Sequence, residues 1–224
     1  MDIRIIEILK KISDKQYKAY LVGGSSRDYL LNKEFTDIDI ATNAPIAFLE
    51  ENFEIVSLTG KCFGSLKINY KNLIAEITLF RQESYDFKSI YPHIEKYVNS
   101  LQEDYLRRDL TINAIYIDYN LNVYDPSNGL KDLRCKRLRF INNPDLRIKE
   151  DPTRIFRIIK FQFQLGFKIP FSLQKVIKKN HLEILRLSKD KYEKEINSLK
   201  KYLNEKQLLK TLKKYKINYN KKGD

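Results

Sequence analysis

Hydrophobic and polar positions recur with two different periods along the first half of the chain. In residues 3–12, Ile5, Leu9 and Ile12 recur at three- to four-residue spacing, which predicts an amphipathic helix. Short apolar or alternating runs predict strands at residues 19–22, 37–41, 54–58, 65–70 and 73–80. Helices are expected between strands, one through Leu31 capped by Ser25 or Ser26 and one from Pro45 to Glu51.

The second half changes in character. Residues 81–101 lack a clean period and predict a long loop, followed by a helix at 103–109, an apolar stretch at 112–117 and a turn at 125–129. No strand is expected after Glu150, where the pattern predicts helices at 151–165, 171–179, 190–203 and 205–215. The fold class is therefore α+β, with an α+β domain over residues 1–142 and a helical domain over residues 143–224.

The composition adds a strong positive charge to this outline. The chain has 224 residues with 42 Lys and Arg against 29 Asp and Glu, a formal net charge of +13. The segment from Phe171 to Asp224 alone has 16 basic and 6 acidic residues. Such an excess favours a polyanionic partner, nucleic acid before a membrane surface, although a purely solubilising face is the alternative.

Other classes of protein are excluded by what the sequence lacks. Two cysteines and two histidines do not provide a four-ligand zinc site at any known spacing. No run approaches the roughly 20 apolar residues of a membrane span, and the charged N-terminus does not have the pattern of a signal peptide. We therefore expect no zinc, no membrane and a cytoplasmic location.

Candidate chemistry is concentrated in the first forty residues. Gly23 and Gly24 precede a predicted helix, where backbone N–H groups can approach a phosphate, and Arg27 adds a cation one turn later. Asp37 and Asp39 lie two apart on a predicted strand, so their carboxylates project side by side. A cation bridging them would be Mg²⁺, which prefers oxygen ligands and phosphates, and this combination suits phosphoryl or nucleotidyl transfer with two metals. Either feature alone is more often structural, and their order along the chain favours function.

The segments around these residues resemble, in order, the motifs of class II tRNA nucleotidyltransferases, a family that includes CCA-adding enzymes and bacterial poly(A) polymerases. The six matching segments are residues 21–42, 59–65, 75–83, 103–114, 125–133 and 150–157, with a looser match at 187–191. The resemblance implies a nucleotidyltransferase head like that of DNA polymerase β, with a mixed sheet and helices, followed by an all-helical neck and body. That helical part is short for the family.

The resemblance also implies roles for individual residues. Asp37 and Asp39 would be catalytic and bind Mg²⁺, with Glu76 as a supporting carboxylate. The nucleotide would be bound by Gly23, Gly24, Arg27, Arg108 and Asp109, and by the base-reading residues Asp151, Arg154, Arg157 and Lys160. Lys160 stands where the family commonly has a third arginine, which keeps the charge but not the planar fork.

Each of these assignments has a structural alternative. Asp151 precedes Pro152 and could simply cap a helix, and Arg154 and Arg157 share a helix face that could be solvated. Residues 107–109 could form a local ion-pair cluster. As a template, Asp151 and Arg154 would present an acceptor and a donor to CTP or ATP, so that a mismatched base would leave buried groups unpaired.

The resemblance implies template-independent addition of CCA to tRNA 3′ ends from CTP and ATP, with release of pyrophosphate. A-adding, CC-adding or poly(A) polymerase activity is the first alternative, and an inactive RNA-binding relative is the second. The loop at residues 84–92 keeps the approximate family length, which argues against a CC-only enzyme, but it lacks the arginine usual before Pro92.

Overall fold

The chain forms two compact units, each with its own core. The computed structural model describes residues 1–86 and 89–218. One unit contains Met1–Glu83 and Ile94–Leu133, and the other contains Ser84–His93 and the chain from Arg134. The division falls after Leu133 rather than after residue 142, because the backbone N–H of Leu138 donates to Lys168 and that of Lys168 donates to Lys136. Residues 134–141 thereby join the helical unit.

A mixed sheet forms the centre of the first unit, as the sequence predicted. Among the described residues its strand order is β3-β4-β5-β2-β1-β8-β9, and β2 and β5 are the parallel pair between antiparallel neighbours. The strands are β1 (Ala19–Leu21), β2 (Ile38–Thr42), β3 (Glu54–Ser57), β4 (Ser65–Tyr70), β5 (Leu73–Leu79), β8 (Tyr116–Ile117) and β9 (Val123–Tyr124). The turn between β4 and β5 is confirmed, since Lys71 and Asn72 both have positive φ angles, as a tight hairpin turn requires.

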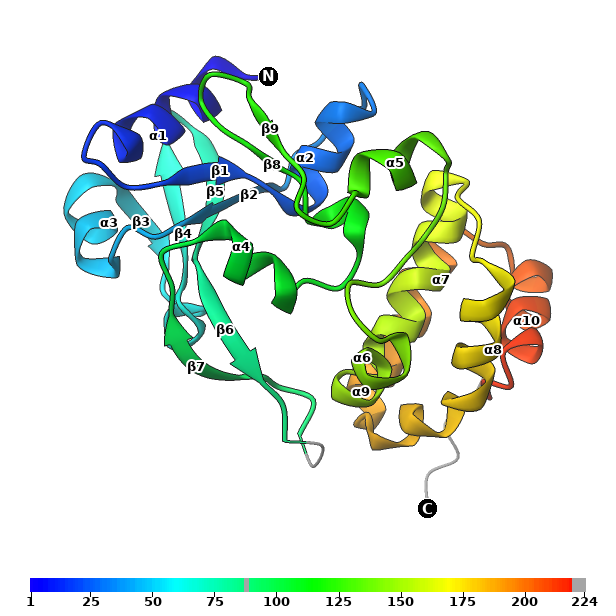
Figure 1. Ribbon diagram of the computed structural model, residues 1–224. Coiled ribbons are helices and arrows are strands. Elements are labelled where there is room, and N and C mark those ends of the chain that lie inside the picture. Colours follow the sequence, from blue (N-terminus) through cyan, green and yellow to red (C-terminus); the bar gives the residue numbers. More distant parts are fainter. Residues whose placement is uncertain (87–88, 219–224) are drawn as a thin grey trace. The chain divides into compact units, whose positions relative to one another are not determined.

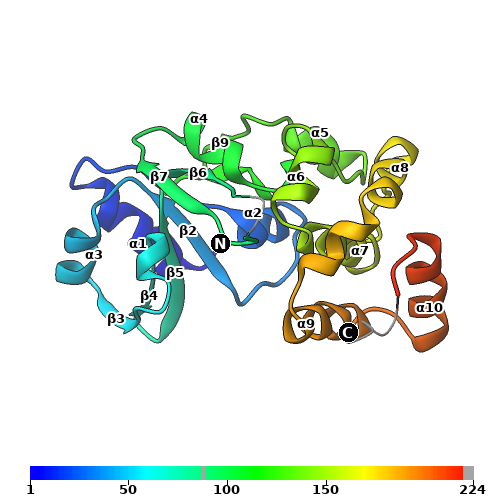
Figure 2. The same cartoon turned by 90° about the horizontal axis from the view of Figure 1, so that it is seen from below.

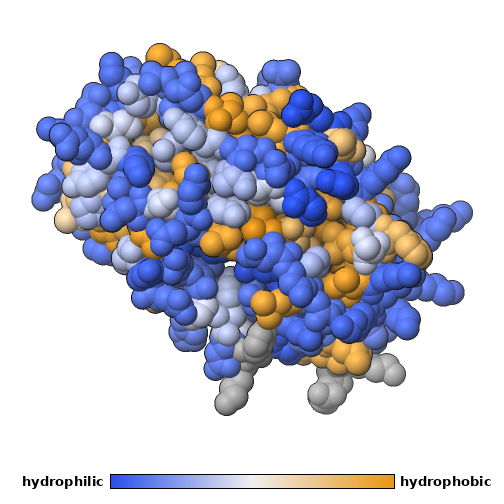
Figure 3. All heavy atoms as spheres, in the orientation of Figure 1, coloured by the Kyte–Doolittle hydropathy of each residue, from blue (hydrophilic) through white to orange (hydrophobic). Residues whose placement is uncertain are grey.

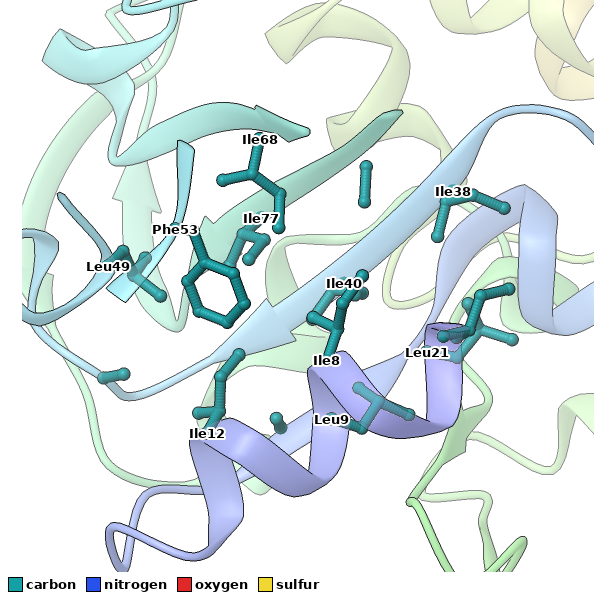
Figure 4. Packing of buried hydrophobic residues seen from close by; sticks show 14 of the residues in the cluster. Ile8, Leu9, Ile12, Leu21, Ile38, Ile40, Leu49, Phe53, Ile68 and Ile77 are labelled. Atoms are coloured by element: carbon teal, nitrogen blue, oxygen red, sulfur yellow. The ribbon is translucent and has the colours of Figure 1, made fainter. Parts of the chain in front are cut away.

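Helix α1 (Ile3–Ser13) covers one face of this sheet (Figure 1). The side chain of Asp2 caps it by accepting from the backbone N–H of Arg4, and Lys10 and Lys11 lie in its last turn. The apolar residues of its inner face, spaced by three and four, are buried, and those labelled in Figure 4 point toward β2 and β5. The core cluster that they form contains Ile8, Leu9 and Ile12 from the helix and Ile40 and Ile77 from the sheet.

The opposite face of the sheet has a second, smaller core. Because side chains alternate along a strand, Tyr20 and Val22 project away from the cluster that contains Ala19 and Leu21. Phe80, Val98 and Leu101 pack against them. Helices α2 (Gly23–Leu30) and α3 (Ile46–Asn52) connect strands, and α4 (Leu101–Asp104) continues into 3₁₀ turns at Tyr105–Arg107 and Thr111–Asn113. The helix predicted over 103–109 is thus only partly present.

The long loop predicted at residues 81–101 is wrong in part. Strands β6 (Arg81–Ser84) and β7 (His93–Tyr97) form a separate two-stranded sheet within it. The residues of β6 are polar, and Arg81 forms an ion pair with Glu83 instead of entering an apolar core. Hydrophobic periodicity therefore does not reveal this strand. Residues 87–88 of the predicted loop lie outside the described part of the chain.

The second unit is helical, as predicted. Its helices are α6 (Pro144–Glu150), α7 (Thr153–Leu165), α8 (Phe171–Lys179), α9 (Lys189–Lys200) and α10 (Glu205–Lys214), with a 3₁₀ segment at His181–Arg186 and α5 (Gly129–Arg134) at the junction. Ile155, Phe156, Ile158 and Ile159 are buried on α7, which confirms them as core. Tyr192 of α9 packs edge-on against Phe156 at 5.6 Å, between helices that lie side by side in Figure 2.

Helix α6 was not predicted, although its start carries a recognisable signal. The side chain of Asn143 accepts from the backbone N–H of Asp145, and Pro144 occupies the first helical turn. Hydrophilic residues predominate on the part of the surface in Figure 3 where α8 and α10 lie. Residues 219–224 of the basic segment lie outside the described residues. Within the described residues, every helix is too short or too polar to cross a membrane.

The burial of α1 predicts a large difference between two isoleucines of the same helix. Ile8→Ala should lower the free energy of unfolding by about 2 to 4 kcal/mol, because Ile8 is fully buried and its removal leaves a cavity. Ile3→Ala, at a side chain that is 64% exposed, should change it by less than about 0.5 kcal/mol. Urea unfolding followed by circular dichroism measures both, and equal losses would contradict this packing of α1.

Candidate active site

The turn between β1 and α2 brings a helix N-terminus against an acidic side chain. Gly23 has a φ of +74°, and a Cβ atom at this position would lie 2.8 Å from Oδ2 of Asp39. Only glycine accommodates both the left-handed backbone and the close carboxylate. A Cβ atom on Gly24 would lie 4.0 Å from the same oxygen, and the backbone of Gly24 lowers the pKa of Asp39, so the glycine turn and the carboxylate lie close together.

Two serines join α2 to the sheet rather than capping it. The hydroxyl of Ser25 donates to the carbonyl of Val22 and accepts from the backbone N–H of Asp39, both at 2.9 Å. The hydroxyl of Ser26 donates to the carbonyl of Ile115 in the neighbouring segment, at 2.7 Å. The predicted cap is therefore wrong, since α2 begins at Gly23 and both serines lie inside it. The hydroxyl of Ser25 instead fixes the helix to β2, and that of Ser26 fixes it to the residue before β8.

Asp39 is the most strongly perturbed carboxylate of this site. It lies on β2 directly opposite Glu76 of the parallel strand β5. Burial and the charge of Glu76 raise the pKa of Asp39 to about 6, and Asp37 also raises it, while Arg108 and the Gly24 hydrogen bond lower it. Asp37 is exposed and immediately precedes the strand. Negative charges thus accumulate at one end of β2, where a cation would relieve their repulsion.

Glu76 has a partner of its own. Its carboxylate accepts a hydrogen bond from the hydroxyl of Ser65 at 2.6 Å, and Ser65 in turn accepts from Thr78 at 3.1 Å. Among the residues that the structure describes, no three His, Cys, Asp or Glu side chains converge as a metal site. The register of β2 and β5 thus sets Glu76 beside Asp39, and both Glu76 and Asp37 act on Asp39 through their charges.

Arg27 lies in the last turn of the same short helix. A Cβ atom on Gly24 would be 3.6 Å from its Nη2 atom, so the guanidinium covers the glycine turn. Its side chain is buried, with two hydrogen bonds to Asp28 and one from Nη1 to Oδ1 of Asn113 at 2.8 Å. The sequence reasoning missed Asn113, although it lies inside the fourth matching segment.

Asn113 also connects Arg27 to Asp109. Its amide donates to Oδ1 of Asp109 at 3.4 Å, and the same oxygen accepts from the backbone N–H of Leu110 at 2.7 Å. Arg27, Asn113 and Asp109 thus form one chain of hydrogen bonds. Arg108 pairs with the fully buried Asp104. Arg107 pairs with Asp104 as well. The expected ion-pair cluster at 107–109 therefore exists, but Asp104 is its centre.

The residues expected to read the base lie in the second unit and surround the start of α7. Oδ1 of Asp151 accepts from the backbone N–H and the hydroxyl of Thr153, at 2.9 and 2.6 Å, so it caps this helix end. Arg154 is buried and donates to Glu150 at 2.7 Å and to the hydroxyl of Tyr85 at 3.1 Å. Glu150 and Tyr85 are partners that sequence reasoning did not assign.

Arg157 and Lys160 continue along α7. Arg157 is exposed, while Lys160 is partly buried, with its ammonium 5.3 Å from the ring of Phe161. Burial raises the pKa of Glu195 on α9, and the charges of Lys160, Arg157 and Asp151 also act on this carboxylate. These three residues therefore lie within electrostatic reach of one acidic side chain, which the sequence alone did not single out.

Solved structures and curated relatives place this geometry among known proteins. The CCA-adding enzyme of Bacillus pumilus is 37% identical over 198 residues, which are 88% of this chain and 49% of the relative. That of Staphylococcus epidermidis is 40% identical over 162 residues, which are 72% of this chain and 40% of the relative. The chain thus spans about half the length of the curated relatives that it matches.

The fold comparison agrees. The Bacillus stearothermophilus CCA-adding enzyme in complex with CTP matches with a TM-score of 0.79 and 28% identity, over 88% of this chain and 47% of that one. A CCA-adding enzyme in an apo form, at 23% identity, matches in fold with a TM-score of 0.82 over 95% of this chain and 52% of that one.

The family model of the poly(A) polymerase head domain matches residues 19–139, a segment that contains the glycine turn, both carboxylates and Arg108. Since this match takes in more than half of the chain, the chain belongs to the poly(A) polymerase head-domain family.

Proposed function

We propose that this chain is a template-independent RNA nucleotidyltransferase that adds CCA to tRNA 3′ ends from CTP and ATP. The observation that carries the proposal is the approach of Gly23 and Gly24 to the carboxylate of Asp39. It joins a phosphate-binding turn to a pair of acidic side chains. The names and ligands of the relatives support the same chemistry, since one matched structure is a CCA-adding enzyme in complex with CTP.

The acidic end of β2 fits magnesium. Its side-chain donors are carboxylate oxygens, and burial together with the charge of Glu76 raises the pKa of Asp39. Asp37 and Asp39 would hold the metal. When bound, Mg²⁺ supplies a positive charge that lowers the barrier to attack at phosphorus and steadies the leaving pyrophosphate.

The other residues would bind and orient the nucleotide. The N–H groups at the start of α2 and the guanidinium of Arg27 would receive the triphosphate, and Arg108 and Asp109 its phosphate or ribose. The 3′-hydroxyl of the tRNA attacks the α-phosphate, and pyrophosphate leaves. Because these side chains are already held by hydrogen bonds, little freedom is lost when the nucleotide binds.

Base selection is proposed for Asp151, Arg154, Arg157 and Lys160 in the second unit. Oδ1 of Asp151 serves the helix end, which leaves Oδ2 as the acceptor for a base. The basic segment from Phe171 would hold tRNA by neutralising its phosphates. These substrates are cytoplasmic, which is where we place the protein.

The decisive experiment supplies Mg²⁺, with CTP, ATP or both, to tRNAs that end before CCA, after C and after CC. Extension to CCA is the expected result. Repeated addition of A would identify a poly(A) polymerase, and addition of C alone or of a single A would identify the narrower enzymes. Binding of tRNA without any incorporation would instead indicate an inactive RNA-binding relative.

Removing either paired carboxylate should abolish incorporation. Asp37→Ala and Asp39→Ala are expected to lose at least about a thousandfold in rate, because charge at the reacting phosphate is no longer neutralised. Gel analysis of extended tRNA measures the loss. Glu54→Ala, at an exposed carboxylate on β3, is the matched control and should remain active. Near wild-type turnover in either aspartate variant would refute the metal assignment.

Loss of Arg154 should relax base choice. Arg154→Ala is expected to reduce the preference for CTP over UTP by about tenfold or more, because a donor to the base is lost. Arg147→Ala is the control, since Arg147 also forms an ion pair with Glu150. Single-nucleotide incorporation with each of the four triphosphates compares the two variants. Unchanged selectivity in Arg154→Ala, or equal relaxation in both, would contradict the template role.

The raised pKa of Asp39 predicts a pH dependence of stability in the metal-free protein. Between the ordinary pKa of 3.8 and the folded value of about 6, the folded state binds the extra proton, so the free energy of unfolding falls as pH rises. Asp39→Asn removes this charge and should stabilise the protein at pH 7.5 by roughly 1 to 2 kcal/mol, while abolishing activity.

Urea unfolding in EDTA at pH 4.5 and 7.5 measures this effect. Asp37→Asn is the comparison and should change stability less, since Asp37 is exposed. If Asp39→Asn is no more stable than the wild type at pH 7.5, the carboxylates are not in mutual repulsion as the structure indicates.

A further inference from the structure

A buried carboxylate holds two arginines beside the candidate site. Asp104 is completely buried in the first unit. Its Oδ1 atom accepts from Nε of Arg107 at 2.7 Å, and its Oδ2 atom accepts from Nη2 of Arg108 at 3.0 Å. The two arginines hold the pKa of Asp104 far below its ordinary value against the opposing effect of burial. Asp104 is therefore a fixed anion to which both guanidinium groups are tied.

Tyr116 completes this arrangement from the sheet. Its hydroxyl donates to Oδ2 of Asp104 at 2.8 Å and accepts from Nε of Arg108 at 2.9 Å. Its ring lies 5.1 Å from the central carbon of the Arg108 guanidinium, and it packs edge-on against Tyr20 at 5.9 Å. Tyr116 is fully buried in β8, so its position is set by the core of the sheet.

The charge of Arg108 reaches the carboxylate site. It lowers the pKa of Asp39, in opposition to burial and to Glu76. An arginine side chain has many rotamers, and fixing one of them costs conformational entropy at the moment of binding unless the folded protein has already fixed it. The contacts with Tyr116 and Asp104 fix it in the free protein.

We propose that Tyr116 is a positioning residue, whose hydroxyl and ring hold Arg108 in the orientation that receives the incoming nucleoside triphosphate. The inference rests on the proposed function, because it takes Arg108 as a contact of the nucleotide. On this proposal, the core residue Tyr116 affects the affinity for the nucleotide indirectly, through the side chain of Arg108.

Tyr116→Phe tests this directly, since it removes one oxygen atom and keeps the ring. The probe is CTP in which a methylene group replaces the oxygen between the α- and β-phosphates, so that binding is measured without turnover. We expect its Kd to rise about tenfold, because a hydrogen bond to a charged group is lost. In the reaction with CTP, KM should rise by a similar factor while kcat changes less.

Tyr124→Phe is the matched control. Tyr124 lies on β9, the strand next to β8, and its hydroxyl also donates to a buried carboxylate, that of Asp118, at 3.1 Å. Its hydroxyl bonds to Asp118 and not to Asp104, and the Kd of this variant should equal that of the wild type. Thermal unfolding establishes that both variants fold. If Tyr116→Phe does not fold, Arg108→Lys, which lacks the Nε donor, is the second variant and should show the same rise in Kd.

A double-mutant cycle identifies the route of the effect. In an Arg108→Ala background, Tyr116→Phe should weaken binding no further, because its action passes through Arg108. An unchanged Kd in Tyr116→Phe, or an equal loss with and without Arg108, would overturn the inference. A wild type that binds the analogue but transfers nothing would refute the proposed function alone. A wild type that does not bind it would refute both.

Discussion

The contact between the Gly23 backbone and the Asp39 carboxylate is the constraint on which the site depends. The left-handed conformation of Gly23 ends β1 and begins α2 within one residue, and the missing Cβ leaves room for Oδ2 at a distance that another side chain would block. Ser25 then attaches the helix to the backbone of Asp39. Phosphate-binding N–H groups and an acidic side chain are thereby fixed together by backbone geometry, before any ligand is present.

The elements that sequence predicted well are those whose stability comes from apolar burial. Helix α1 and the hairpin of β4 and β5 follow from hydrophobic periodicity and turn residues, and both are confirmed. Strand β6 was missed because its residues are satisfied by ion pairs such as Arg81 with Glu83. Charged pairing has no period in the sequence, so it can be found only when the fold brings the partners together.

Distance along the chain also explains which residues of the candidate site were predicted and which were missed. The glycine turn and the carboxylates Asp37 and Asp39 lie close to one another in the sequence, so their spacing alone predicted a common site. Asn113 lies far along the chain from its partner Arg27, and Tyr85 is separated from Arg154 by 69 residues. The ordered motifs identified the family correctly. A motif gives the residue types at each position, but it does not show which side chains are hydrogen-bonded to each other in the fold.

The buried charged groups of the two units are arranged differently. In the first unit, Asp39 and Glu76 face each other with a raised pKa at Asp39, an arrangement that destabilises the free protein and that a bound cation would relieve. In the second unit, Arg154 shares the carboxylate of Glu150 with Arg147 and also donates to the hydroxyl of Tyr85. A carboxylate site whose pKa stays raised despite the charge of Arg108 is suited to attract a cation and, through it, a phosphate. We propose that Arg154, held in one orientation by these partners, reads a base by the direction of its hydrogen bonds.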